Sequence, residues 1–233
     1  MDLFFSNQIY DDKIILSEAE SIHCLKALRK RLNDSIFITN GIGKIFKASI
    51  YKIENNIVIC NNITLHFTDK LKKNISIGIS IIKNKNRLEW FLEKATEIGV
   101  NNIYPIICNK TEKKLVNKKR GENIIMSAMK QSNNCILPIL HNPITFNEVF
   151  NINIQLGVIA HCHNLPKLKL HDLLNKKENA KEIMILIGPE GDFTYDEIEL
   201  SKSYGFIAVE LSKNRLRTET AGVVACNMIN TFL

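Results

Sequence analysis

Short apolar runs alternate with helix-like segments over the last two thirds of the chain, and this rhythm is its most constraining feature. Apolar runs occupy residues 75–82, 155–160 and 183–187, and the segments between them carry apolar residues at helical spacing. Strands that alternate with helices in this way form a mostly parallel sheet covered on both faces. The sequence therefore predicts an α/β fold for this part of the chain.

Three long helices can be placed within this rhythm, besides a shorter one near residues 145–150. The first is predicted to begin at Asn86, with Glu89 at the capping-box position, and to end at Gly99. The other two are predicted at about residues 118–132 and 218–231. The last one is apolar nearly all round, which indicates burial on more than one side. Burial within one chain and burial against a second subunit both account for it.

The N-terminal region has a different rhythm. Short alternating strands are separated by turn signals such as Asn40-Gly41, which is typical of a small β-barrel. A polar and basic stretch at residues 71–74 separates this region from the α/β part. We therefore predict two domains, residues 1–71 and residues 72–233.

One predicted helix interrupts the barrel and carries a basic cluster. Ser17 and Glu20 have capping-box spacing at its start, and Ile22, Leu25 and Leu28 are expected to point inward. Its end holds four cations, Lys26, Arg29, Lys30 and Arg31. Cations are favourable at any helix C-terminus, so phosphate binding and simple helix stabilisation both explain the cluster.

Composition narrows the class of protein. The net charge of +7 is compatible with a polyanionic partner, although lysine is frequent throughout the chain. The six cysteines include no CxxC pair, which argues against a disulfide framework or a zinc ribbon and fits a reducing cytosol. The N-terminus lacks the pattern of a signal peptide, and no apolar run reaches the roughly 18 residues of a membrane helix. A cytoplasmic protein without membrane segments is expected.

Two unusual loops follow consecutive apolar strands near the C-terminus. Residues 188–192 are glycine-rich, and residues 212–220 carry Arg217, Thr218 and Glu219. Ligands of open α/β sheets bind outside the carboxyl ends of the strands, so these loops are the predicted site. Neither loop matches a dinucleotide fingerprint or a P-loop. Thr194 and Glu197 have capping-box spacing just after the first loop, which predicts a helix N-terminus there. Thr218 is also a candidate helix N-cap.

A metal site is not expected. His161 and His163 alternate on one side of a strand end, but no third ligand is near them in the sequence.

Several motifs, taken in order, resemble the bacterial ribosomal RNA small subunit methyltransferase E family. The matching stretches are residues 23–29, 94–100, 131–132, 187–191 and 216–221. They span essentially the whole chain. The resemblance implies an N-terminal PUA-like barrel and a C-terminal SPOUT domain with a trefoil knot, which acts as a homodimer.

The resemblance also implies methylation of N3 of one uridine in 16S rRNA of the small ribosomal subunit, with S-adenosylmethionine as cofactor. The implied cofactor-binding residues are Leu186, Ile187, Gly188, Pro189, Glu190, Gly191, Leu211, Ser212, Asn214, Leu216, Arg217 and Thr218. The implied RNA-binding residues are His23, Lys26, Arg29, Lys30, Arg31 and Gln131. A methyl acceptor that must lose a proton needs a base and a cation, for which Arg217, Glu219 and Glu190 are the candidates.

The chain departs from the family pattern at three places. Lys130 stands where the family usually has Glu, Asn134 stands where Arg is usual, and the loop of residues 212–215 has its arginine one position late, at Arg215. These positions bear on RNA contacts. A methyltransferase of the same fold acting on tRNA or another rRNA site, or a non-catalytic RNA-binding relative, therefore stays an alternative.

Overall fold

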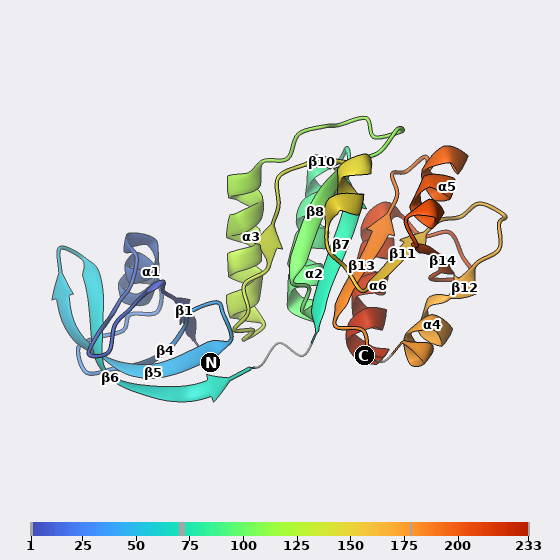
Figure 1. Cartoon of the computed structure of the whole chain (residues 1–233). Helices are drawn as coiled ribbons and strands as arrows, with labels where there is room; N and C mark the ends of the chain where they lie inside the picture. Colours follow the sequence, from blue (N-terminus) through green and yellow to red (C-terminus); the bar gives the residue numbers. More distant parts are fainter. Residues whose placement is uncertain (1, 70–72, 178, 233) are drawn as a thin grey trace. The chain divides into compact units, whose positions relative to one another are not determined.

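The computed structural model describes residues 2–69, 73–177 and 179–232, which form two compact units (Figure 1). The first unit comprises Met1–Leu71 together with Met129–Leu137, and the second comprises Lys72–Ala128 and Pro138–Leu233. The boundary predicted near residue 71 had assigned the segment Met129–Leu137 to the second domain. The structure groups that segment with the first unit instead.

The first unit is built on one curved six-stranded sheet (Figure 1). Its strands are β1 (Leu3–Phe5), β2 (Gln8–Ile9), β3 (Ile14–Ile15), β4 (Ser35–Thr39), β5 (Lys44–Glu54) and β6 (Ile57–Thr68). Their order is β1-β4-β5-β6-β3-β2, and no pairing between described strands joins β1 to β2. The sheet is therefore open, unlike the predicted barrel. The two end strands, β1 and β2, have only three and two residues, so they offer few backbone groups for the hydrogen bonds that would close the sheet into a barrel.

The predicted basic helix is short and changes from α-helical to π-helical geometry along its length. It consists of α1 (Glu18–Ile22) and a π-helical turn, η1 (His23–Ala27). The Ser17 hydroxyl accepts a hydrogen bond from the Glu20 amide at 3.3 Å, which is the first half of the predicted capping box. The Glu20 carboxylate turns elsewhere and accepts from the Phe5 amide. Ile22 is exposed rather than inward, because Ser21 and Cys24 occupy the buried face.

Backbone hydrogen bonds attach the segment Met129–Leu137 to the first unit. The Gly43 amide donates to the Cys135 carbonyl at 2.9 Å, and the Leu137 amide donates to the Gly41 carbonyl at 2.8 Å. Cys135 is buried in a cluster with Leu3. This segment thus extends the structure of the N-terminal unit, although it begins 58 residues beyond the predicted boundary at residue 71.

The second unit is built on an eight-stranded sheet in which every described pairing is parallel. Its strands are β7 (Asn74–Ser80), β8 (Asn102–Ile107), β9 (Ile139–Leu140), β10 (Ile144–Thr145), β11 (Leu156–Ala160), β12 (Leu168–Lys169), β13 (Glu182–Ile187) and β14 (Ile207–Glu210). The order is β10-β8-β7-β13-β11-β14-β12, and β9 pairs with β8. The predicted α/β class with a parallel sheet is confirmed.

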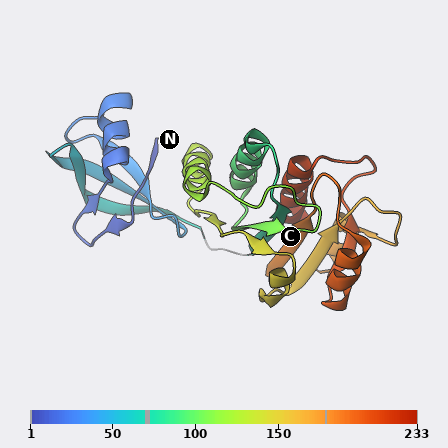
Figure 2. The same ribbon diagram turned by 90° about the horizontal axis from the view of Figure 1, so that it is seen from above.

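Helices cover both faces of this sheet. They are α2 (Lys85–Ile98), α3 (Lys118–Gln131), the 3-10 helix η2 (Asn147–Asn151), α4 (Leu170–Lys176), α5 (Tyr195–Ser203) and α6 (Thr218–Phe232). Figure 2 shows α2 and α6 on one face and η2 and α5 on the other. Gly222 allows α6 to pack closely on α2, because a Cβ atom there would lie 2.6 Å from Phe91. No helix within the described residues is long and apolar enough to cross a membrane.

The C-terminal end of α2 agrees with the sequence-based prediction, whereas its N-terminal end does not. Gly99 ends the helix in a left-handed conformation, with φ of 105°, as predicted. The N-cap is Asn84, however, and not Asn86, because the Asn84 side chain accepts the hydrogen bond from the Asn86 amide. Glu89 binds Arg120 instead of completing a capping box.

Candidate functional site

The candidate site is a cavity of about 620 Å³ at the carboxyl ends of β13, β11 and β14. These three strands are neighbours in the sheet, with β11 in the middle. The loops that follow them converge because parallel strands end at the same edge. The cavity therefore lies where the topology of an open α/β sheet places ligands.

The first wall is the loop between β13 and α5. Gly188 is buried at its start, and a Cβ atom there would lie 3.0 Å from the Phe193 ring. The Thr194–Glu197 pair forms the complete capping box that the sequence predicts, so the loop is fastened to the N-terminus of α5. The loop is thereby held close to the strand end, where Gly188, Pro189 and Glu190 line the cavity.

The second wall is the loop between β14 and α6. The Thr218 hydroxyl donates a buried hydrogen bond of 3.0 Å to the Gly188 carbonyl, which joins the two loops. The prediction of Thr218 as an N-cap is therefore wrong: it is the first residue of α6, and the first helical carbonyl belongs to Arg217. The Arg215 guanidinium donates to the Glu190 carbonyl at 3.1 Å.

The third wall, after β11, was missed by the sequence-based prediction. His161, Cys162 and Lys167 line the cavity. The Cys162 amide donates to the Asp192 carboxylate at 2.7 Å, which ties this loop to the loop after β13. Lys167 holds the loop in shape by donating to the carbonyls of His161 and His163 at 3.1 and 2.8 Å. The histidines were considered only as metal ligands, and the position of β11 between β13 and β14 was the missing information.

His161 has an unusual environment in this wall. It is only 6% exposed, and neither ring nitrogen has a hydrogen-bond partner within the described residues. Burial, and to a smaller extent the nearby Lys167, lowers the pKa of His161 from 6.5 to about 4. The imidazole is therefore neutral at physiological pH. Within the described residues, no three His, Cys, Asp or Glu side chains are grouped as metal ligands would be.

Most residues predicted to bind the cofactor lie in the cavity wall. Those that line it are Ile187, Gly188, Pro189, Glu190, Leu211, Ser212, Asn214, Leu216, Arg217 and Thr218. Leu186 and Gly191 are outside the lining. Leu186 packs into the core, and Gly191 lies against the Lys110 side chain. Lining residues that were not predicted include Ala160, Asp192, Val209, Glu210, Lys213, Arg215 and Ala221.

The three catalytic candidates occupy two environments. Arg217 and Glu190 are exposed and line the cavity. Glu219 is 6% exposed and lies outside the lining. One of its carboxylate oxygens is 3.5 Å from Nε of Arg87 in α2, and the other is buried without a hydrogen-bond partner within the described residues. The first two can reach a ligand in the cavity, whereas Glu219 is placed to hold Arg87.

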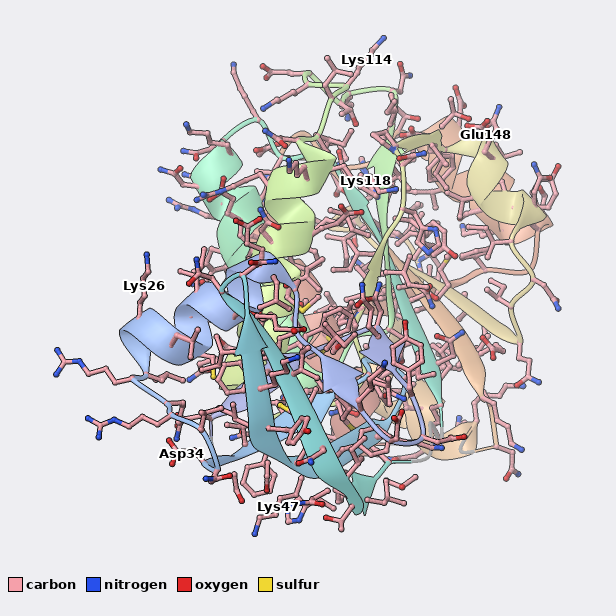
Figure 3. All side chains as sticks on the ribbon, turned by 90° about the vertical axis from the view of Figure 1, so that its left-hand side faces the viewer. Lys26, Asp34, Lys47, Lys114, Lys118 and Glu148 are labelled. Carbon is pink, nitrogen blue, oxygen red and sulfur yellow. The ribbon has the colours of Figure 1, made fainter. Side chains whose placement is uncertain are left out.

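The predicted RNA-binding residues belong to the first unit. His23, Lys26, Arg29, Arg31 and Gln131 are exposed. Figure 3 shows Lys26 extending away from the ribbon. Lys30 pairs with Asp2 at 3.1 Å, so part of its charge is compensated within the chain.

Comparisons with known proteins give the family. The model of the RNA methyltransferase domain matches residues 69–230. A ribosomal RNA small subunit methyltransferase E of Rickettsia conorii is 30% identical over 222 residues, which cover 92% of this chain and 88% of that protein.

Solved structures agree with this result. A probable rRNA-methyltransferase from Porphyromonas gingivalis has a TM-score of 0.86 at 31% identity, covering 100% of this chain and 98% of its own. A ribosomal RNA small subunit methyltransferase E from Neisseria gonorrhoeae, bound to S-adenosyl methionine, has a TM-score of 0.82 at 26% identity, covering 97% and 95%. The chain therefore belongs to the RNA methyltransferase domain family and, within it, to the ribosomal RNA small subunit methyltransferase E family.

Proposed function

We propose that the chain transfers a methyl group from S-adenosylmethionine to N3 of a uridine in the 16S rRNA of the small ribosomal subunit. The observation that carries this proposal is the cavity at the ends of β13, β11 and β14, whose wall includes exposed Arg217 and Glu190. Membership of the family adds the type of substrate. The related structure bound to S-adenosyl methionine adds the cofactor.

The cavity suits this cofactor in size and lining. Its volume of about 620 Å³ falls in the usual range for small-molecule sites, roughly 300–1,000 Å³. Ile187, Leu211 and Leu216 offer apolar contacts for a purine ring. Buried Gly188 keeps the loop after β13 close to the strand end, where its backbone can approach a ligand. We assign cofactor contacts to the predicted residues of both loops, except that the Arg217 side chain is directed to the methyl acceptor, and Leu186 and Gly191 support the loops from outside the lining.

The chemistry requires removal of a proton from N3 and stabilisation of charge on the uracil oxygens. When bound, S-adenosylmethionine supplies the methyl group on a sulfonium, and the methyl passes to N3 as the carbon–sulfur bond breaks. Arg217 stabilises the negative charge that develops on the uracil oxygens. Glu190, exposed at the cavity rim, accepts the N3 proton and later releases it to solvent. Glu219 is a positioning residue that holds Arg87 and the start of α6.

The finer architecture is also part of the proposal. We infer that the second unit is a SPOUT domain with a trefoil knot and that the first unit is PUA-like. We further infer a homodimer in the cytoplasm. The half-buried Val223, Val224 and Met228 and the 45% exposed Phe232 on α6 support a second copy at this helix.

Contacts between the first unit and RNA complete the proposal. His23, Lys26, Arg29, Arg31 and Gln131 are exposed and free to contact an RNA backbone or base. Lys30 contributes less, since Asp2 already pairs with it.

Transfer of a labelled methyl group tests the proposed function. The protein is incubated with labelled S-adenosylmethionine and with small subunits, large subunits or tRNA from cells that lack the modification. We expect label in the small subunit RNA alone. Label in tRNA or in large subunits would show that the proposed substrate is wrong. No label in any of the three RNAs would favour a non-catalytic RNA-binding protein.

A further inference from the structure

Residues 110–119, called here the basic loop, connect the end of β8 to the first turn of α3. They include five lysines, at positions 110, 113, 114, 118 and 119, and a single acidic residue, Glu112. Glu112 is already paired with Lys83 at 2.6 Å. Lys113, Lys114 and Lys119 are exposed and form no ion pair within the described residues. The loop thus carries positive charge that the described part of the second unit does not compensate.

Helix stability does not explain this charge. Lys118, Lys119 and Arg120 occupy the first turn of α3, which contains no acidic residue. The N-terminus of a helix is the positive end of its dipole, so cations are unfavourable there. In Figure 3, Lys114 and Lys118 are on the loop and on the first turn of α3, respectively. Arg120 pairs with Glu89 at 3.0 Å and Lys118 with Glu122 at 3.9 Å, so within the described residues only the charge of Lys119 in this turn lacks an ion-pair partner.

The basic loop contacts the loop between β13 and α5 at Gly191, one residue beyond Glu190, which lines the cavity. Lys110 donates a hydrogen bond of 2.8 Å to the Gly191 carbonyl, and Arg215 donates one of 3.1 Å to the preceding carbonyl, that of Glu190. Two cations from segments far apart in sequence thus bind successive carbonyls of the same loop. The loop that Lys110 and Arg215 both contact also carries the exposed Glu190 carboxylate.

We propose that the basic loop binds the phosphates of the single-stranded RNA segment next to the target nucleotide. This inference rests on the proposed function and names the surface that presents its substrate. Lys113, Lys114 and Lys119 contact the phosphates on one side of the Glu190 segment, and Lys213 and Arg215 contact them on the other. The target base enters the cavity between the two basic segments.

The charges and the chemistry of the target support this path. A phosphate is repelled by the Glu190 carboxylate, whereas the N3–H group of a uracil is attracted to it, so a base and not a phosphate belongs at that point. The N3 edge is also hidden in paired RNA, which requires an unpaired or flipped nucleotide. Leu115 is 77% exposed among the lysines and offers an apolar contact to a neighbouring base.

Matched triple variants test the inference. The test variant is Lys113→Ala/Lys114→Ala/Lys119→Ala. The control variant, Lys176→Ala/Lys177→Ala/Lys181→Ala, removes the same charge from exposed lysines between the last residue of α4 and the amino end of β13, the end of that strand opposite to the cavity. The probe is a short fluorescein-labelled single-stranded RNA that contains uridine, bound by the full chain. Fluorescence anisotropy gives the dissociation constant over a range of salt concentrations.

We expect the test variant to bind more weakly at low salt and to lose about 2 units of slope in the plot of log K against log salt, since each phosphate contact in single strands contributes roughly 0.7. The control variant should keep the slope of the original protein. Equal slopes in the test variant and the original protein would overturn the inference, and so would an equal loss in both variants.

Methyl transfer by the unchanged protein separates this inference from the proposed function. A loss of slope confined to the test variant, with no methyl transfer by the original protein, would support the RNA surface and reject the enzyme. Methyl transfer by the original protein with an unchanged slope in the test variant would reject the surface alone. Calorimetric titration with S-adenosylmethionine should give equal affinities for all three proteins.

Discussion

The Thr218 hydroxyl donates to the Gly188 carbonyl at 3.0 Å, and this buried bond joins the two loops that carry most of the predicted cofactor residues. Gly188 follows β13 and Thr218 begins α6, so the bond fastens the start of α6 to the end of β13 in the cavity wall. The Thr218 side chain, which the sequence predicted to cap a helix, instead connects the two loops of the cavity wall.

Replacing Thr218 with Val should weaken both stability and cofactor binding. Val keeps the shape but leaves the buried Gly188 carbonyl without its donor, which costs about 1–3 kcal/mol. Urea unfolding of the second unit can be followed by the fluorescence of Trp90, the only tryptophan in the chain. The control Thr218→Ser keeps the hydroxyl and should stay near the original stability. If Val and Ser variants unfold at the same urea concentration, the bond contributes nothing.

Lys130 and Glu20 form an ion pair, with side chains 17% and 12% exposed. This pair accommodates Lys130 where the family usually has Glu, and it binds the segment Met129–Leu137 to α1. Lys130→Met should destabilise the first unit by about 3 kcal/mol, because it leaves a buried carboxylate without its cation. Hydrogen exchange in β1 and in the Met129–Leu137 segment measures the loss.

The double variant Glu20→Gln/Lys130→Met provides the control for this pair. It removes both charges, so it should recover most of the stability that Lys130→Met loses. Additive losses in the two single variants, with no recovery in the double variant, would show that the two residues are not coupled.

His161 should make stability depend on pH in a defined window. Its folded pKa of about 4 lies below the ordinary 6.5, so the unfolded chain binds a proton first as pH falls. The contribution is fully present above pH 6.5 and is lost between about 6.5 and 4, to an extent on the order of 3 kcal/mol. The titratable groups around it are Lys167 and His163 on the same loop, Asp192 after β13 and Lys202 on α5.

Urea unfolding at several pH values checks the role of His161. His161→Leu should remove most of the pH dependence between 6.5 and 4. His171→Gln is the matched control, since His171 is on the surface of α4 and pairs with Asp172. An unchanged pH profile in His161→Leu would mean that other groups cause the dependence.

Arg217→Ala should leave cofactor binding nearly intact while lowering methyl transfer at least about 100-fold, which is the usual scale for loss of a group that stabilises developing charge. Lys213→Ala in the same loop is the control for removal of a cavity cation and should have a smaller effect on transfer. Calorimetry gives the cofactor affinity, and single-turnover transfer gives the rate. Loss of cofactor binding in Arg217→Ala would make Arg217 a structural residue of the pocket.

Periodicity and capping signals predicted the local structure of the second unit well. The alternation of strands and helices gave the parallel sheet, Gly99 ended α2, and Thr194 with Glu197 began α5. These features depend on residues close in sequence, where backbone geometry and side-chain chemistry act directly.

Features set by distant residues were not predictable in this way. His161 became part of the cavity because β11 pairs with both β13 and β14, an order that no local pattern records. Thr218 bonds a carbonyl 30 residues away. The segment Met129–Leu137 joins the first unit through bonds to Gly41 and Gly43.

The identity of the methylated nucleoside tests the central proposal most directly. Small subunits labelled with S-adenosylmethionine are digested to nucleosides, which are separated and identified by mass spectrometry. The account predicts that the label is found in 3-methyluridine from 16S rRNA and is lost with Arg217→Ala. Label in any other nucleoside, or 3-methyluridine formed equally well by the Arg217→Ala variant, would contradict it.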